Sequence, residues 1–388
     1  LFSEILLQTP SIDLMRPEDR KDAEEAPLSL LSSYAPFPTL LVRNIHLSPK
    51  LLSVMLDLAG KPDLREKLKM PKVVVADSFV RVPEVESAVE RLSDVATLRI
   101  RTLTRGEMTG GGRDFLERLG TLDFPGKLSY DECNRGLVLG EAMRGGYPTC
   151  RDGTPDERHD FFHDLIRAVC HTDLPVISRL KNPQTLRKVY RMVGAASGEV
   201  LNLTQIARVL DIGRPLVRRC VEALESLYLV EAVPVWSGAD RFERSIRSPK
   251  HVVTDSGWLC GLLGQCAVDP NVLPNVRPDD VRRLLSGWTW AQLAALVDDD
   301  SPWALRHFAL RTGLTVEWLL EHRENGRLIA LQTSSKENVG PEDFSMLAKF
   351  RSLVGEDQPV QSVLFYCGQS VRRYDGVGAA VPFAHLWR

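Results

Sequence analysis

The chain has 388 residues, a length that predicts two to four domains instead of a single core. Hydrophobic residues make up 44% and charged residues 26% of it, as in ordinary globular proteins, and the net charge of −2 gives no overall attraction to nucleic acid. No apolar run approaches the roughly 20 residues of a membrane-spanning helix. The seven cysteines are scattered and form no CxxC pair, which favours reduced thiols and a cytoplasmic setting.

The first hundred residues alternate between short apolar runs and helical patterns. The apolar runs are Ile12–Leu14, Thr39–Val42, Lys72–Ala76 and Thr97–Ile100. The helical patterns between them are Pro17–Glu25, Leu28–Ser33, Pro49–Leu58 and Pro83–Leu92. Alternation at this spacing predicts a parallel sheet covered by helices, and therefore an α/β fold.

Residues 114–185 have the periodicity of helices. The longest helical patterns are Tyr130–Met143 and Asp156–Cys170, and Gly145-Gly146-Tyr147-Pro148 lies between them. Three glycines, Gly110 to Gly112, precede this region and predict a linker.

Four residues of this region have side chains that bind zinc in other proteins. His159 and His163 are one helical turn apart, and Cys170 and His171 follow. Adjacent residues 170 and 171 point to different faces of a helix, so they cannot easily complete one tetrahedral site. The sequence therefore predicts solvent-facing histidines and no metal site.

The middle of the chain has the pattern of a helix-turn-helix followed by two strands. A helical pattern at Leu203–Leu210 ends at the turn 211–213, whose glycine is expected to supply a positive φ. Pro215 then suits the first turn of a second helix. The hydrophobic run Leu227–Trp236 and the later His251–Val253 predict a pair of strands. This order is typical of the winged helix.

Three arginines, Arg214, Arg218 and Arg219, lie at the start of the second helix and are candidates for nucleic-acid contact. Residues 186–250 hold eleven Lys or Arg against seven Asp or Glu, so this part of the chain is mildly basic. Such arginines could meet phosphates or guanine edges in a major groove. One alternative is that Arg218 and Glu222 form an ion pair one helical turn apart on a solvated face. Another is that this helix packs inside the protein, and we favour packing.

The C-terminal region, 251–388, mixes strands and helices. The predicted strands are Phe308–Leu310, Val316–Glu321, Arg327–Thr333 and Gln361–Tyr366, and the predicted helix is Pro341–Ser352.

Three phrases give the chain a resemblance to a known family. They are Gly145-Gly146-Tyr147-Pro148, SGEVLNLTQIARVLDI at 197–212 and RSPKHVVTDSGW at 247–258. From about Ile12 to Trp387 the chain resembles prokaryotic AAA-type ATPases that have a winged helix and a C-terminal domain similar to restriction endonucleases. The resemblance implies four domains: an ATPase core lacking the phosphate loop (1–110), a helical lid (111–185), a winged helix (186–250) and a nuclease-like domain (251–388).

The positions that the resemblance assigns to ATP hydrolysis lack the residues that this reaction requires. No GxxxxGK[ST] phosphate loop occurs, and the resemblance would place that loop immediately before Leu1. Arg43 and Asn44 occupy the places of two carboxylates, one for Mg²⁺ and one for the attacking water. Ser78 is a weak candidate for γ-phosphate contact, and Asp94 stands where an arginine is usual. The chain itself is expected to bind no cofactor, and ATP with Mg²⁺ would require a phosphate loop upstream.

The nuclease-like positions are also degenerate. The resemblance implies an acidic residue on one strand and Glu-x-Lys on the next, a set that binds a divalent metal. Here the acidic residue is kept as Glu317, but the other two positions are Gln332 and Ser334. One carboxylate without a lysine cannot assemble that site.

These losses favour an ATPase-derived binding or regulatory protein without catalytic activity. One alternative is an ATP-hydrolysing protein whose phosphate loop lies upstream of Leu1. The other is a DNA-binding regulator that uses Arg214, Arg218 and Arg219. A protein partner or self-association is compatible with all three hypotheses, and a membrane is not expected.

Overall fold

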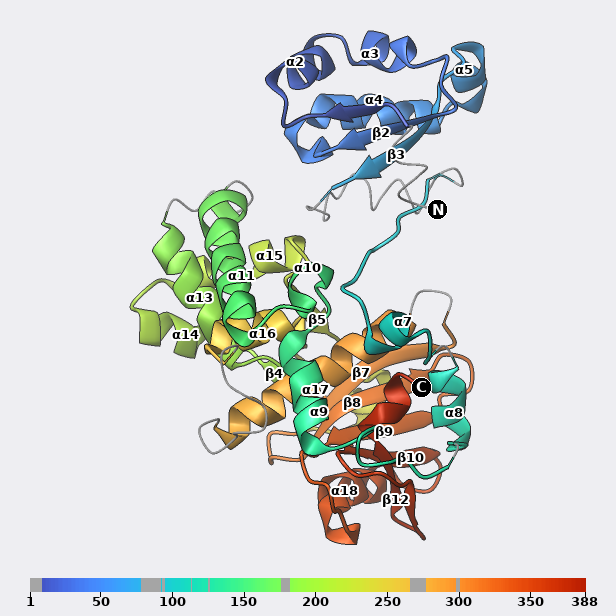
Figure 1. Cartoon of the computed structure of the whole chain (residues 1–388), viewed down its shortest axis with the longest axis vertical. Helices are drawn as coiled ribbons and strands as arrows, with labels where there is room; N and C mark the ends of the chain where they lie inside the picture. Colours follow the sequence, from blue (N-terminus) through green and yellow to red (C-terminus); the bar gives the residue numbers. More distant parts are fainter. Residues whose placement is uncertain are drawn as a thin grey trace. The chain divides into compact units, whose positions relative to one another are not determined.

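A computed structural model describes residues 9–77, 92, 95–112, 114–124, 126–175, 182–265, 277–297 and 301–388 (Figure 1). The chain forms two compact units. The first contains residues Leu1–Ile100 with Ser226–Tyr228, and the second contains Arg101–Glu225 with Leu229–Arg388. The division falls ahead of the boundary predicted at 110, and the predicted lid, helix-turn-helix and C-terminal region lie almost entirely in the second unit.

The first unit is a small parallel sheet with helices. Its strands are β1 (Ser11–Asp13), β2 (Thr39–Arg43) and β3 (Lys72–Ala76), in the order β1-β2-β3, and both pairings are parallel. Its helices are α2 (Pro17–Glu25), α3 (Pro27–Ser33), α4 (Pro49–Ala59) and α5 (Pro62–Lys67), with a 3₁₀ turn at Ile45–Leu47. The predicted parallel sheet is thus confirmed for three strands.

Local sequence explains these elements well. Each of the four helices has a proline in its first turn, where the missing N–H costs no hydrogen bond. The apolar residues of β1 and β2, among them Ile12, Leu40 and Val42, are buried in the core of the unit, whereas Val74 and Val75 of β3 are exposed.

The sequence predicted a strand and a helix at the end of this unit, and the structure confirms neither. The fourth predicted strand, Thr97–Ile100, is wrong, because these residues pair with no strand in the described part of the chain and Leu98 and Ile100 are 83% and 87% exposed. The predicted helix Pro83–Leu92 lies, except for its last residue, outside the described residues.

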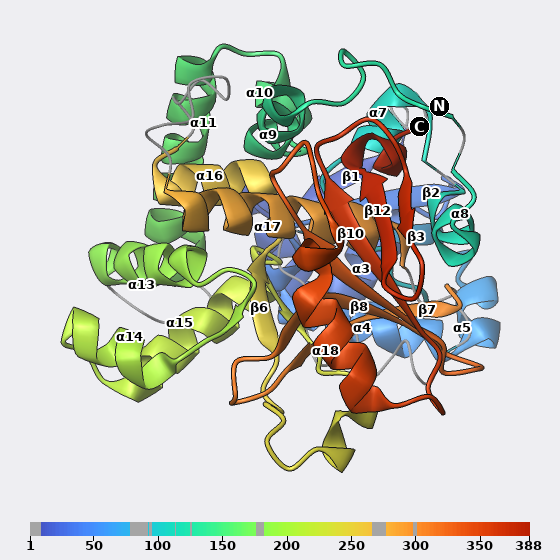
Figure 2. The same cartoon turned by 90° about the horizontal axis from the view of Figure 1, so that it is seen from below.

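The second unit is built on a six-stranded mixed sheet (Figure 2). The strands are β7 (Trp303–Ala309), β8 (Thr315–His322), β9 (Leu328–Thr333), β10 (Val360–Tyr366), β11 (Arg372–Tyr374) and β12 (Gly378–Pro382). Their order is β11-β12-β10-β9-β8-β7, with parallel pairs β9–β10 and β10–β12. The predicted strands in 316–333 and 361–366 are confirmed, and β7 starts earlier than the prediction at Phe308–Leu310.

Helices cover both faces of this sheet. Ile329 and Leu331 of β9 pack in one core cluster with Trp288 of the long helix α17 (Pro278–Leu296). The alternate residues of β9 pack in a second cluster with α18 (Ser345–Val354), which follows a 3₁₀ turn at Pro341–Phe344. The alternation along one strand therefore places the two helices on opposite faces.

The remaining helices of the second unit precede α17. Besides the two helices of the helix-turn-helix, they are α7 (Arg105–Thr109), α8 (Phe115–Thr121), α9 (Arg135–Arg144), α10 (Pro148–Arg151), α11 (Pro155–Ala168), a π-helical turn (Val169–Asp173), α13 (Pro183–Ala195) and α16 (Ser256–Leu263). The helix predicted from Tyr130 starts only at Arg135, because the Asn134 side chain caps it by accepting from the Leu137 N–H. The three predicted linker glycines are not a free linker: the Gly112 N–H donates to the Arg388 carbonyl.

The helix-turn-helix predicted in the middle of the chain is present. Its elements are β4 (Glu199–Val200), α14 (Leu203–Leu210), α15 (Arg214–Ser226), β5 (Val230–Val233) and β6 (Lys250–Val253), with the antiparallel strands in the order β4-β6-β5. The expectation for Gly213 is wrong, because Asp211 is the residue of this turn with a positive φ, 51°. Aspartate tolerates this left-handed conformation better than most residues.

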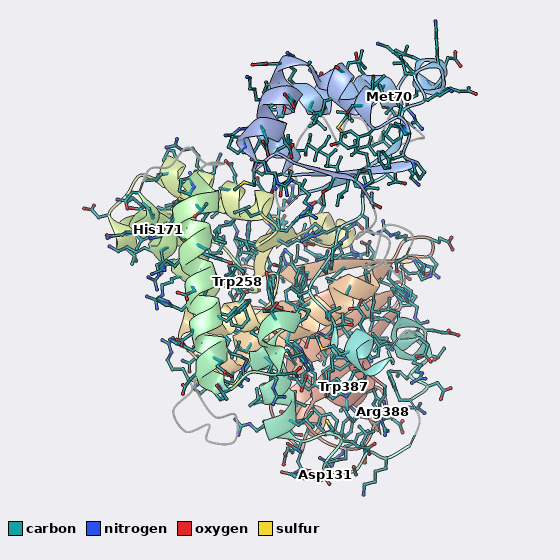
Figure 3. The ribbon with its side chains drawn as sticks, turned by 45° about the horizontal axis from the view of Figure 1, so that its top comes forward. Met70, Asp131, His171, Trp258, Trp387 and Arg388 are labelled. Carbon is teal, nitrogen blue, oxygen red and sulfur yellow. The ribbon has the colours of Figure 1, made fainter. Side chains whose placement is uncertain are left out.

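Two of the phrases that gave the resemblance meet in the interior of the second unit. The buried Asp255 carboxylate caps α16 and accepts from the Trp258 N–H at 2.9 Å and the Gly146 N–H at 2.8 Å. The Tyr147 and Trp258 rings lie 5.9 Å apart, and Trp258 lies among the helices of the unit (Figure 3). Residues 145–148 therefore connect the end of α9 to the start of α16 through the Asp255 carboxylate.

Candidate functional site

The three parallel strands of the first unit end in register, at the edge where open α/β sheets bind ligands. Arg43 ends β2 and is exposed, and Asn44 follows it with a left-handed backbone. The Asn44 amide donates to the Asp13 carboxylate at 2.9 Å. The backbone N–H of Met15, then Asn44 and the nearby arginines, hold the Asp13 pKa below its usual value.

A second carboxylate at this edge, Asp77, is also engaged. It accepts from the His46 backbone N–H at 3.0 Å and lies 2.9 Å from the His46 ring nitrogen Nδ1. The carboxylates near Arg43 and Asn44 thus already have partners, and these residues do not fit a Mg²⁺–nucleotide centre. Ser78 and Asp94 lie outside the described residues.

The position that the resemblance assigns to a nuclease site lies on β8 and β9 in the second unit. The antiparallel register pairs Trp318 with Leu331, which makes Glu317 and Gln332 neighbours across the two strands. The Glu317 carboxylate accepts from the Thr333 hydroxyl at 2.9 Å and from the Ser286 hydroxyl of α17. Burial raises the Glu317 pKa despite these hydrogen bonds.

A lysine that was not predicted from the sequence lies close to Glu317 and comes from another element. Lys250 of β6 is buried, and its ammonium donates to the Val316 and Glu317 carbonyls, each at 3.3 Å. Burial lowers the Lys250 pKa to about 8, and the charge of Glu317 partly opposes this effect. The feature of the sequence that could have identified Lys250 is its position directly before the predicted strand His251–Val253.

The arrangement around Glu317 does not fit a divalent metal. Its partners are two hydroxyls and a nearby ammonium, whereas Mg²⁺ and Mn²⁺ require several oxygen ligands with negative charge. Across the described ranges, no group of three His, Cys, Asp or Glu side chains could hold a metal ion. His159 and His163 stack with their ring centres 6.2 Å apart, while Cys170 is buried and His171 exposed.

We expect the native chain to bind Mn²⁺ weakly, and the double substitution Gln332→Glu with Ser334→Lys to strengthen binding by about tenfold or more. The first change adds a carboxylate beside Glu317, and the second supplies the lysine of the nuclease-like pattern. Titration followed by Mn²⁺ electron paramagnetic resonance measures the affinity. Adding Glu317→Gln to the double variant should abolish the gain, and tight binding by the native chain would contradict the prediction.

Arg214, Arg218 and Arg219 all lie at the start of α15 and are exposed in the second unit. Their side chains have no ion pair with any residue that the structure describes. The buried residues of this helix, among them Val217 and Val221, lie on its other face. Packing inside the second unit, which the sequence favoured, therefore does not use the arginine face.

The connection between β5 and β6 is fixed to the edge of the large sheet. Its residue Val235 pairs with His307 of β7, and Ser245 pairs with Leu310 just after β7. The Trp236 N–H donates to the His307 carbonyl at 2.9 Å, and the Trp236 ring packs against Phe308 and Phe350. This connection is thus part of the core of the unit.

None of the described helices is long and apolar enough to span a membrane. Six cysteines lie within the described residues, and all of them are buried and free of disulfide bonds.

Comparison with known proteins gives relatives without an assigned activity. Residues 140–268 match the family "Domain of unknown function (DUF8612)". The chain is 24% identical over 278 residues to "Uncharacterized protein Rv2008c" of Mycobacterium tuberculosis and equally to "Uncharacterized protein Mb2031c" of Mycobacterium bovis. These alignments cover 69% of this chain and 59% of each relative, so the chain spans less than two thirds of their length. No solved structure matches the chain.

Proposed function

We propose that this chain acts by binding instead of catalysis, and that its ligand is duplex DNA held along α15. The observation that supports the proposal is the group Arg214, Arg218 and Arg219, exposed and without ion pairs among the described residues at the start of the second helix. In a helix-turn-helix, the N-terminal residues of the second helix contact base edges and phosphates. We interpret the module as a winged helix whose wing, 234–249, lies on the sheet.

The chemistry of the two carboxylate positions that the structure describes supports the proposal that the chain is not catalytic. Arg43 and Asn44 stand at the sheet edge of the first unit, and Glu317 has hydroxyl partners and a lysine beside it. On the resemblance stated above, we propose that both units descend from catalytic domains, an AAA-type ATPase core and a nuclease-like domain. Their present role would be to carry and orient the DNA-binding helix.

Binding should weaken steeply with salt. Each phosphate neutralised contributes about −0.9 to the slope of log K against log salt, so three arginines predict a slope of about −2 to −3. Affinity for arbitrary duplexes should fall in the range of roughly 10⁻⁴ to 10⁻⁶ M at physiological salt. Fluorescence anisotropy with a labelled duplex, titrated at low and moderate salt, measures both quantities.

The substitutions Arg214→Ala and Arg218→Ala together should reduce the slope by about 2 and weaken binding at low salt. A matched control is Arg311→Ala with Arg323→Ala, which removes the same charge from two exposed arginines near the ends of β7 and β8. Equal losses in the two double variants would indicate a general charge effect. No binding by the native chain at low salt would refute the proposal.

A further inference from the structure

A buried carboxylate in the second unit is surrounded by three arginines from separate elements. Glu141 of α9 is only 3% exposed. It pairs with Arg144 of the same helix at 2.8 Å, with Arg105 of α7 at 3.3 Å and with Arg151 of α10. One carboxylate cannot occupy the donors of three guanidinium groups, each of which has five N–H bonds.

The three guanidinium groups border a cavity of about 340 Å³. Its lining includes Arg105, Glu141, Arg144 and Arg151, together with the exposed Asp152. The three arginines thus exceed the two carboxylates by one positive charge. The Arg105 Nε–H is buried and makes no hydrogen bond within the described part of the chain, although the Glu141 carboxylate is near. The lining is therefore the environment of an anion site, because guanidinium groups donate charge-assisted hydrogen bonds to anions.

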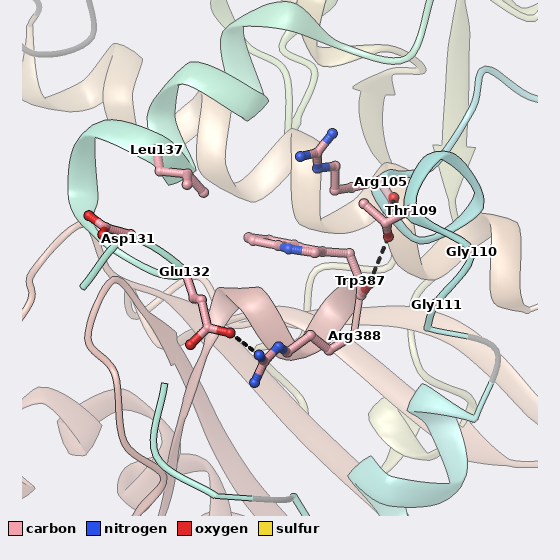
Figure 4. Close-up of a pocket in the computed structure, with 9 residues that line it drawn as sticks. All are labelled: Arg105, Thr109, Gly110, Gly111, Asp131, Glu132, Leu137, Trp387 and Arg388. Atoms are coloured by element: carbon pink, nitrogen blue, oxygen red, sulfur yellow. Dashed lines mark hydrogen bonds and ion pairs between the residues drawn. The ribbon is translucent and has the colours of Figure 1, made fainter. Parts of the chain in front are cut away.

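A second cavity of about 460 Å³ adjoins the first one at Arg105, which lines both. Its chemistry is different: the Trp387 indole extends into it between Arg105 and Leu137 (Figure 4). Asp131 lies at the end of this cavity away from Arg105, and its carboxylate has no partner among the described residues. Along the two cavities the order is thus the Asp131 carboxylate, the edge of the Trp387 indole, which is 8% exposed, and then the arginines.

We propose that the two cavities together bind a nucleotide, as a site separate from α15. The phosphates would lie between Arg105, Arg144 and Arg151, where guanidinium groups bind phosphate oxygens in pairs. The base lies against the Trp387 indole, and its amino group donates to the Asp131 carboxylate. The combined space is within the range of ligand pockets, roughly 300 to 1,000 Å³.

Isothermal titration calorimetry of the whole chain with three probes tests this proposal. ADP has both parts of the ligand, pyrophosphate has only the phosphates and adenosine has only the base and sugar. We expect ADP to bind more tightly than either part alone. Arg144→Gln should weaken ADP binding by about tenfold or more, because it removes a charge-assisted contact while Arg105 and Arg151 still neutralise Glu141. The control Arg323→Gln, at an exposed arginine between β8 and β9, should leave the affinity unchanged.

Photo-crosslinking of the native chain with 8-azido-ADP gives a readout that depends on no substitution. Mass spectrometry should place the label on peptides containing Trp387, Leu137 or Asp131. Labelling elsewhere, no saturable ADP binding at millimolar concentration, or equal affinity for pyrophosphate and ADP would each overturn the nucleotide assignment. An Arg144→Gln variant that keeps the native melting temperature and the native ADP affinity would do the same.

Discussion

The substitution Asp255→Ala is expected to lower the free energy of unfolding of the second unit by about 3–5 kcal/mol. The Asp255 carboxylate is buried and accepts hydrogen bonds from the N–H groups of Gly146 and Trp258, on segments far apart in sequence. Alanine removes the cap of α16 and leaves both donors buried without an acceptor. Denaturation in urea, followed by tryptophan fluorescence, measures the change.

The exposed Asp240 provides the control for this experiment. It pairs with Arg247 on the surface, where both side chains are about 70% exposed, so Asp240→Ala should change stability by no more than about 0.5 kcal/mol. A loss below about 1 kcal/mol for Asp255→Ala would mean that water replaces the carboxylate, contrary to the burial seen here.

The second large effect is a contribution of Lys250 to the pH dependence of stability, which the variant Lys250→Met should lack. The folded protein lowers the Lys250 pKa from 10.5 to about 8, chiefly by burial. Between these two values the unfolded chain binds more protons at this residue than the folded chain does. Stability therefore rises as pH increases from about 8 towards 10.5, and the gain from this residue is about 3 kcal/mol.

Other groups near Lys250 make a comparison with the variant necessary. Glu317 of β8, Glu199 of β4, Arg282 of α17 and His307 of β7 all interact electrostatically with this ammonium. Tyrosines and cysteines also titrate at alkaline pH, so the difference between wild type and Lys250→Met is the informative quantity. Urea denaturation at several pH values from 7 to about 10 measures it. Parallel stability curves for the two proteins would show that Lys250 titrates normally.

The sequence predicted the elements whose signals are local. Helix α2 and strand β3 were predicted with their observed bounds, because a proline in the first helical turn and a run of β-branched valines act within a few residues. The strand predicted at Thr97–Ile100 had a similar apolar pattern. It failed because a strand also requires a neighbouring strand, and none of the described strands pairs with these residues.

The chemistry of the sites was less predictable, since it depends on contacts between distant segments. Glu317 and Gln332 were expected on adjacent strands, and the register agrees. Lys250 was missed because a lysine is rarely buried, and only the packing of β6 beside β8 places it near Glu317. The arginines around Glu141 likewise come from three helices, and their spacing in the sequence does not predict that they contact one carboxylate.

The attachment of the β5–β6 connection to β7 has a mechanical consequence. Because this connection is bonded to the sheet on both sides of its turn, at Val235 and Ser245, it cannot swing as a free arm. A torque applied to α15 by a bound duplex would be transmitted through β5 and β6 into the edge of the sheet. The helix and the sheet would consequently turn as one rigid body and lose their structure in a single cooperative transition.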